Sequence, residues 1–132
     1  MYLLDTCVIS DFLRGHVLTT KRCLEQSPSV LHISALTYFE MSYGFVKAPW
    51  AKQQYRDALS SLMETLQVLP FSTKESVEAA KIRHFLTTQG KPIGAYDVLI
   101  ASTALANNCI MVTANEREFR RVPDLTVENW RR

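Results

Sequence analysis

Residues 66–90, LQVLPFSTKESVEAAKIRHFLTTQG, contain one complete strand-and-helix unit. The apolar run 66–69 is followed by Pro70, which has no backbone N–H and therefore ends a buried strand. Residues 72–89 are expected to form a helix, because one apolar face recurs at helical spacing through Ala79, Ile82 and Leu86. Gly90 stands where a helix end needs the left-handed backbone conformation, so we expect the helix to stop there.

The same order of strand and helix recurs along the rest of the chain. Further short apolar or β-branched runs lie at residues 2–4, 30–33 and 110–112. Helical patterns lie between them, one beginning near Pro49 and one covering residues 95–107. This alternation predicts an α/β fold, a mainly parallel sheet with helices on both faces. Ligands bind such sheets at the carboxyl ends of the strands.

The composition is that of one folded domain, which we expect to span residues 1–132. No apolar run is long enough for a signal peptide or a membrane span, so we expect a cytoplasmic protein with no membrane partner. The three cysteines are odd in number and lack the spacing of a zinc site, so we expect free thiols at Cys7, Cys23 and Cys109. The net charge of +2 is too small to identify a nucleic-acid-binding protein.

Three acidic residues are placed to meet at one edge of the predicted sheet. Asp5 directly follows the first strand, Glu40 lies just after the second, and Asp97 lies in the first turn of the helix before the fourth. Carboxylates in one cleft repel each other unless a cation neutralises them. Hard oxygen ligands favour Mg²⁺ or Mn²⁺ over zinc. The three residues therefore predict a divalent-metal site.

Each acid also has a purely structural interpretation. Thr37 and Glu40 match a capping box, Asp97 could complement a helix dipole, and Asp5 could cap the following helix. Position alone leaves both interpretations open for each residue. Only convergence of all three at one edge favours the metal site.

Several motifs, in order and at consistent spacing from Tyr2 to Trp130, resemble those of VapC-type PIN domains. They are Leu3-Leu4-Asp5-Thr6, Ile33-Ser34-x-x-Thr37-x-x-Glu40-x-x-x-Gly44, Gly90-Lys91-Pro92-Ile93-Gly94-x-x-Asp97-x-x-Ile100-Ala101, and Val112-Thr113-x-Asn115-x-x-Glu118-Phe119-x-Arg121-Val122-Pro123, followed by Leu125 and Trp130. The resemblance implies a PIN-like fold. It also implies that Asp5, Glu40 and Asp97 are the family's metal-binding acids.

The chain departs from the family pattern at two positions. Many PIN domains have a fourth acid where this chain has Asn115, whose amide oxygen can still ligate a hard cation or hold a bound water. We therefore include Asn115 among the catalytic residues, whereas Glu118 is better interpreted as a solvated charge in a turn. Cys7 stands where the family often has Asn. The nearby hydroxyls of Thr6, Ser34 and Thr113 are candidates to orient carboxylates or waters.

The resemblance implies a toxin of a toxin–antitoxin pair, an endoribonuclease that uses Mg²⁺ or Mn²⁺ to hydrolyse RNA to 5′-phosphate and 3′-hydroxyl ends. It further implies a cognate antitoxin, a homodimer and an RNA substrate. A tRNA is favoured as the substrate because such substrates are common in the family. An aromatic cluster could serve such contacts, although core packing is the favoured use for most of its members, Tyr38, Phe39, Tyr43, Phe45 and Trp50.

Other functions fit these residues less well. A metal-free ribonuclease needs a base such as His, but structural roles are favoured for His32, in a predicted buried strand, and His84, on a helix. Two classes of phosphatase fail on spacing, since Cys7 and Leu13 occupy the positions where an Asp and an Arg would be needed. The strongest rival is a non-catalytic PIN-like module that binds RNA or protein, because Asn115 leaves the metal site one acid short.

Overall fold

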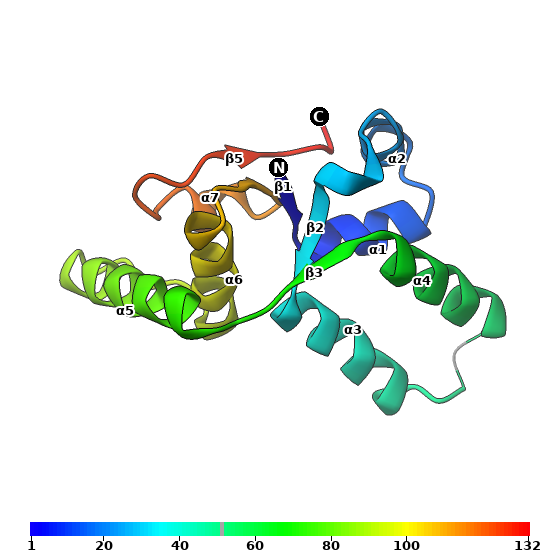
Figure 1. The fold of residues 1–132 in the computed structure, drawn as a ribbon, viewed down its shortest axis with the longest axis horizontal. Helices are drawn as coiled ribbons and strands as arrows, with labels where there is room; N and C mark the ends of the chain where they lie inside the picture. Colours follow the sequence, from blue (N-terminus) through cyan, green and yellow to red (C-terminus); the bar gives the residue numbers. More distant parts are fainter. Residues whose placement is uncertain (51) are drawn as a thin grey trace.

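The computed structural model describes residues 1–50 and 52–132 and contains one five-stranded sheet with helices on both faces (Figure 1). The strands are β1 Tyr2–Leu4, β2 Leu31–Ser34, β3 Gln67–Leu69, β4 Ile110–Val112 and β5 Val127–Glu128. The helices are α1 Thr6–Leu13, α2 Val17–Leu24, α3 Ala35–Lys47, α4 Gln53–Thr65, α5 Thr73–Thr88, α6 Ala95–Ala106 and α7 Glu116–Phe119, with a 3-10 turn, η1, at Pro28–Val30. All strand pairings are parallel, which confirms the predicted α/β class.

The strand order is β3-β2-β1-β4-β5, so the direction of winding reverses beside β1. The chain first adds β2 and β3 on one side of β1 and then crosses to add β4 and β5 on the other. Connections that leave neighbouring strands in opposite directions open a crevice at the carboxyl ends of those strands. Here the crevice lies between β1 and β4, which pair Leu3 with Met111 and Leu4 with Val112.

Two hydrophobic clusters cover the two faces of the sheet. Successive strand residues point to opposite faces, and accordingly Leu3 and Met111 join one cluster while Leu4 and Val112 join the other. The first cluster packs β1 and β4 against α5, α6 and α7, and the second packs the sheet against α1, α2 and α4. Both faces of the central strands are therefore buried, as a parallel sheet requires.

Helix ends follow the predicted local chemistry. Gly90 adopts the left-handed conformation with φ 66°, and its N–H donates to the Thr87 carbonyl while the Lys91 N–H donates to that of Leu86. This is the Schellman arrangement that satisfies the last carbonyls of α5. Helix α6 ends in the same way at Asn108, with φ 55°. The expected helix ends near residues 90 and 107 are both confirmed.

The structure corrects the start of one helix and adds elements that the sequence did not predict. Helix α4 begins at Gln53 and not near Pro49, which instead lies after the end of α3. The sequence patterns predicted neither the helices α2 and α7, nor the turn η1, nor the short edge strand β5. Beyond β5, Trp130 is 3% exposed and packs edge-to-face on Tyr2 with ring centroids 5.1 Å apart. The C-terminal segment is therefore part of the core.

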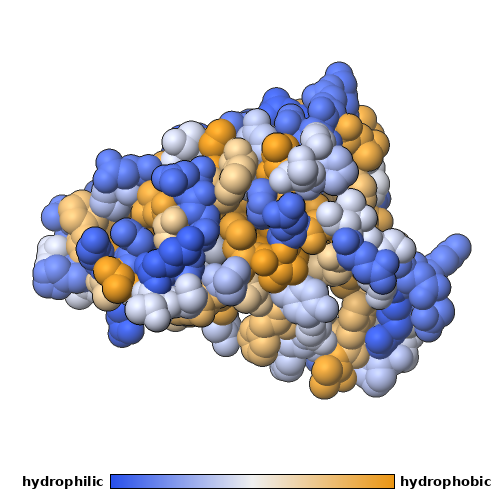
Figure 2. Space-filling model, viewed as in Figure 1, coloured by the Kyte–Doolittle hydropathy of each residue, from blue (hydrophilic) through white to orange (hydrophobic). Residues whose placement is uncertain are grey.

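The aromatic side chains of α3 correct a second expectation. Core packing was favoured for most of the cluster, but most of it is exposed: Tyr38 46%, Phe39 50%, Tyr43 56% and Trp50 80%. Figure 1 shows α3 and α4 as neighbouring helices with a gap between them, and the gap is open in the space-filling view (Figure 2). Phe45 near the end of α3 contacts Tyr55 of α4, with ring centroids 6.0 Å apart. Hydrophobic side chains on the rest of α3 stay accessible beside the sheet.

Glu75 of α5 is fully buried, and its carboxylate accepts hydrogen bonds from the Ser72 backbone N–H at 2.9 Å and from Asn107 Nδ2 at 3.0 Å. Burial would raise the pKa of Glu75, but these bonds and one from the Ser72 hydroxyl outweigh it and lower the pKa to about 2. Glu75→Gln removes the charged acceptor and should cost about 2 kcal/mol of unfolding free energy, roughly 5 °C in Tm.

The matched control for this prediction is Glu78→Gln on the same helix, where the carboxylate makes only a surface ion pair with Lys81 at 3.6 Å. Thermal melts at neutral pH should show little change in the control. Because the pKa of Glu75 is lowered, its contribution is present at neutral pH and is lost as the pH falls toward 2. Equal melting temperatures for the two variants would refute a stabilising role for Glu75.

Candidate active site

Asp5 lies at the crevice between β1 and β4. It follows β1 and caps α1, accepting the Thr6 backbone N–H on Oδ1 at 2.9 Å. Its second oxygen, Oδ2, accepts the hydroxyl of Thr113, the residue after β4, at 2.7 Å. The side chain is thus fixed from both strands that border the crevice. Burial raises the pKa of Asp5, and the hydrogen bonds from Thr113 and Thr6 partly offset that rise.

Glu40 is tied to Asp5 through Thr6. The Thr6 hydroxyl donates to Glu40 Oε1 at 3.0 Å, across the gap between α1 and α3. The capping-box interpretation of Glu40 is wrong, because Ser34 caps α3 by accepting the Thr37 N–H at 3.0 Å. Burial raises the pKa of Glu40, and the negative charge of Asp5 adds to the rise.

Asp97 lies in the first turn of α6 and has the most perturbed carboxyl group of the crevice. Its pKa rises to about 7, first because of burial and then because of the charge of Asp5, a hydrogen bond shared with Glu118, and the charges of Glu118 and Glu40. The neighbouring Gly94 makes room for this side chain, since a Cβ at Gly94 would lie 3.3 Å from Asp97 Oδ2.

Glu118 shares a hydrogen bond with Asp97 and adds to the negative charge around it. Glu118 is therefore a candidate for the fourth position of the site beside Asn115. Asn115 is exposed, and its backbone N–H donates to the Thr113 hydroxyl at 2.9 Å. Glu118 follows Asn115 by three residues, one helical turn, and this spacing is the sequence signal that could have identified it.

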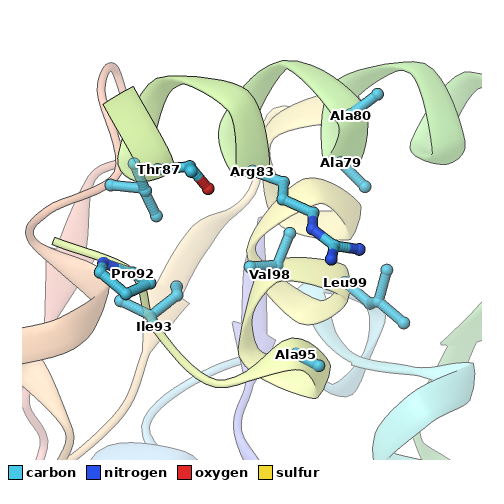
Figure 3. Close-up of a pocket in the computed structure, with 10 residues that line it drawn as sticks. Ala79, Ala80, Arg83, Thr87, Pro92, Ile93, Ala95, Val98 and Leu99 are labelled. Atoms are coloured by element: carbon cyan, nitrogen blue, oxygen red, sulfur yellow. The ribbon is translucent and has the colours of Figure 1, made fainter. Parts of the chain in front are cut away.

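The four carboxylates supply only oxygen donors, which suits a hard divalent cation. Within residues 1–50 and 52–132, however, no three His, Cys, Asp or Glu side chains surround one point closely enough to hold a metal ion as they stand. A separate hollow of about 570 Å³ between α5 and α6 has no carboxylate in its lining (Figure 3). Figure 3 shows Arg83 reaching over that hollow toward Val98 and Leu99. The acid chemistry therefore belongs to the β1/β4 crevice.

Comparison with known protein families matches residues 2–125 to the PIN domain model. The chain is a PIN domain of the VapC type. It is 33% identical to ribonuclease VapC2 of Rickettsia felis, with 98% of each chain covered. It is 29% identical to the tRNA(fMet)-specific endonuclease VapC of Salmonella typhimurium, covering 98% of this chain and 97% of the relative.

Solved structures agree with this assignment. A chain of the VapBC2 crystal structure from Rickettsia felis, bound to a DNA fragment from its promoter, superposes with a TM-score of 0.87 at 33% identity and 98% coverage of both chains. A chain of the DNA-bound VapBC structure from Salmonella typhimurium gives a TM-score of 0.88 at 29% identity, covering 98% of this chain and 97% of that chain. The PIN-like fold implied by the sequence motifs is thus confirmed.

Cys7 distinguishes this PIN domain from the family pattern described above. Its thiol donates to Asp5 Oδ2 at 3.7 Å and accepts the Ala114 backbone N–H at 3.5 Å. The thiol therefore bridges the two loops that leave β1 and β4. Burial and the charge of Asp5 raise the pKa of Cys7, so the thiol stays protonated and donates to the carboxylate. All three cysteines are free, as expected.

The histidines of this PIN domain lie outside the crevice contacts. His32 is 3% exposed, and its Nδ1 lies 3.2 Å from the Val30 carbonyl. His16 caps α2 by accepting the Thr19 N–H, and His84 lies on the exposed side of α5. The buried position and the carbonyl contact of His32 fit the structural role that the sequence favoured for it. His84 is exposed, so the structure gives it no comparable role. No helix among the described residues has the length and apolarity needed to cross a bilayer.

Proposed function

We propose that this VapC-type PIN domain is a divalent-metal-dependent endoribonuclease and the toxin of a toxin–antitoxin pair. The observation that carries the proposal is the gathering of four acids around the β1/β4 crevice, namely Asp5, Glu40, Asp97 and Glu118. The charges of Asp5, Glu118 and Glu40 contribute to the raised pKa of Asp97, and the charge of Asp5 contributes to the raised pKa of Glu40. Membership of the VapC group supports it, because curated relatives are named ribonucleases and endonucleases. PIN-domain ribonucleases as a family depend on a divalent metal.

We propose Mg²⁺ or Mn²⁺ as the metal and Asp5, Glu40 and Asp97 as its ligands, with Glu118 completing the acidic set. When bound, such a cation activates the attacking water and shields the charge that develops on the phosphate. Ligation calls for rotation about side-chain bonds of Glu40 and Glu118, whose long side chains are only half-buried. Asp5 is held in place by Thr113 and Thr6 and supplies the fixed point of the site.

The residues around the acids position them and regulate their charge. The Thr6 backbone N–H donates to Asp5 Oδ1, and the Thr6 hydroxyl donates to Glu40 Oε1. Thr6 therefore links the start of α1 to α3. Thr113 orders the loop after β4 by accepting the Asn115 N–H while it donates to Asp5. Hydroxyls that orient ligating carboxylates typically change metal affinity or activity by about 10- to 100-fold when removed.

The substrate we propose is a tRNA, and the partner a cognate antitoxin. The Salmonella relative carries tRNA(fMet) in its name, and both structural neighbours above are VapBC complexes. The exposed aromatic rings on α3 fit contacts with an antitoxin or with a second copy in a homodimer. We propose the cytoplasm as the location of the reaction, because an RNA substrate and a protein antitoxin are both present there.

The test is cleavage of an initiator tRNA transcript by the purified chain. Activity should fall to background in EDTA and return when Mg²⁺ or Mn²⁺ is added in excess, and the new ends should be 5′-phosphate and 3′-hydroxyl. Cleavage that persists in EDTA and leaves 2′,3′-cyclic phosphates would contradict the proposal. Binding without cleavage under every divalent metal would favour the non-catalytic PIN-like module instead.

A further inference from the structure

A positively charged hollow lies beside the acidic crevice. It has a volume of about 350 Å³ and is lined by Phe85, Gln89, Lys91, Arg117, Arg120 and Arg121, among others, with no acid in its lining. It is formed by the C-terminal end of α5, the loop 91–94 and helix α7. This concentration of charge stands out in a chain whose formal net charge is only +2.

Two of the four cations have no partner among residues 1–50 and 52–132. Arg120 is engaged by Glu116 at 2.9 Å, and Arg121 donates to the Pro92 carbonyl at 3.2 Å. Among the residues that the structure describes, the Lys91 ammonium and the Arg117 guanidinium make no hydrogen bond or ion pair. Both side chains are exposed and free to contact an anion.

The hollow and the acidic crevice are built from the same two segments. Glu118 of α7 lies beside Asp97, whereas Arg117 of the same helix lines the hollow together with Arg120 and Arg121, which directly follow the helix. The loop 91–94 carries Lys91 and leads directly into the first turn of α6, which holds Asp97. Arg121 ties α7 to this loop through Pro92. The hollow and the crevice therefore share the segments 91–97 and 116–121.

We infer that this hollow is a subsite for the RNA backbone, in which Lys91 and Arg117 bind phosphates next to the cleavage site. The inference rests on the proposed ribonuclease function and adds the residues that hold the substrate. Phosphate contacts fix the register of a nucleic acid on a protein without reading its sequence. The half-exposed ring of Phe85, 41% exposed at the rim, offers a stacking surface for an unpaired base.

The experiment compares RNA binding by the double variant Lys91→Ala/Arg117→Ala and by the control Lys21→Ala/Lys47→Ala, which removes the same charge from exposed positions on α2 and α3. Both pairs are placed in an Asp97→Asn background so that the initiator tRNA probe stays intact. The hollow variant should bind roughly tenfold more weakly at low salt, and its log affinity should depend less steeply on log salt by about 1.4. The control should match its parent in affinity and salt slope.

Two further measurements separate this role from others. The charge-preserving variant Lys91→Arg/Arg117→Lys should retain the affinity, and thermal melts should show all variants folded. Lys91 also follows the C-terminus of α5, where positive charge favours the helix dipole, but that role would lower Tm without changing RNA affinity. If the active chain cleaves the probe while the hollow variant binds it as the control does, the subsite is wrong and the ribonuclease proposal stands. If the hollow variant loses affinity but no metal supports cleavage, the ribonuclease proposal fails and the subsite stands.

Discussion

Asp97→Asn is expected to reduce RNA cleavage by roughly 100- to 1000-fold while the fold stays intact. The substitution removes one charged ligand from the proposed metal site and preserves the size of the side chain. In EDTA the variant should melt at a higher temperature than the parent, because a neutral amide relieves the repulsion from Asp5, Glu118 and Glu40. Cleavage assays in Mn²⁺ and thermal melts in EDTA measure the two effects.

The pH dependence of stability provides a second readout for the same variant. The folded-state pKa of Asp97 is raised to about 7, so the native state binds its proton more tightly than the unfolded state does. Stability of the metal-free parent should therefore fall as the pH rises from about 4 to about 7. This part of the slope should be absent from Asp97→Asn. Asp124→Asn is the matched control, since Asp124 is exposed and its φ of 66° is one that Asn tolerates.

An Asp97→Asn variant with the activity of its parent would remove Asp97 from the proposed site. A parent whose stability in EDTA does not change between pH 4 and pH 7 would instead contradict the crowding of carboxylates around it. The Asp124→Asn control should retain both the activity and the pH dependence of the parent.

Glu118→Gln is expected to weaken Mn²⁺ binding and cleavage by about 10- to 100-fold. Glu118 shares a hydrogen bond with Asp97 and adds to the negative charge that a cation would neutralise. A tenfold loss of affinity lowers the stabilisation by excess metal by about 1.4 kcal/mol, or about 4 °C in Tm. Thermal melts across a Mn²⁺ titration therefore measure the loss independently of activity.

Asn115→Asp is the comparison that decides which residue completes the site. The added charge should lower Tm in EDTA and enlarge the rise in Tm on adding Mn²⁺. This gain should be smaller than the loss caused by Glu118→Gln, because the Asn115 side chain is exposed. If Mn²⁺ raises the Tm of Glu118→Gln as much as that of the parent, and only Asn115→Asp changes this response, then Asn115 and not Glu118 is the fourth residue of the metal site. Equal shifts in all three proteins would place both residues away from the metal.

The sequence by itself determined the elements whose causes are local. Hydrophobic periodicity predicted four of the strands and the helices of residues 72–89 and 95–107. Cap conformation predicted the helix ends at Gly90 and Asn108. These rules depend only on residues a few positions apart, so they can be read from one stretch of chain. The motifs around Asp5, Glu40 and Asp97 likewise lie in contiguous blocks.

Weak or non-local signals explain the elements that were missed. Helix α2 leaves Val17 83% and Leu24 71% exposed, so it has no apolar stripe strong enough to detect. Strand β5 has two residues and exists through its pairing with β4. The aromatic residues of α3 have core-forming side chains, but Tyr38, Phe39 and Tyr43 stay about half exposed because no other described element covers them fully.

Only the tertiary structure decided how the acids are held and which of them lie near Asp97. Asp5, Glu40, Asp97 and Glu118 lie far apart in the chain, and they meet because β1 is placed between β2 and β4. The links that fix them, Thr113 to Asp5 and Thr6 to Glu40, join residues 108 and 34 positions apart. Strand order and long-range hydrogen bonds depend on how whole layers pack, a property that no local pattern of residues contains.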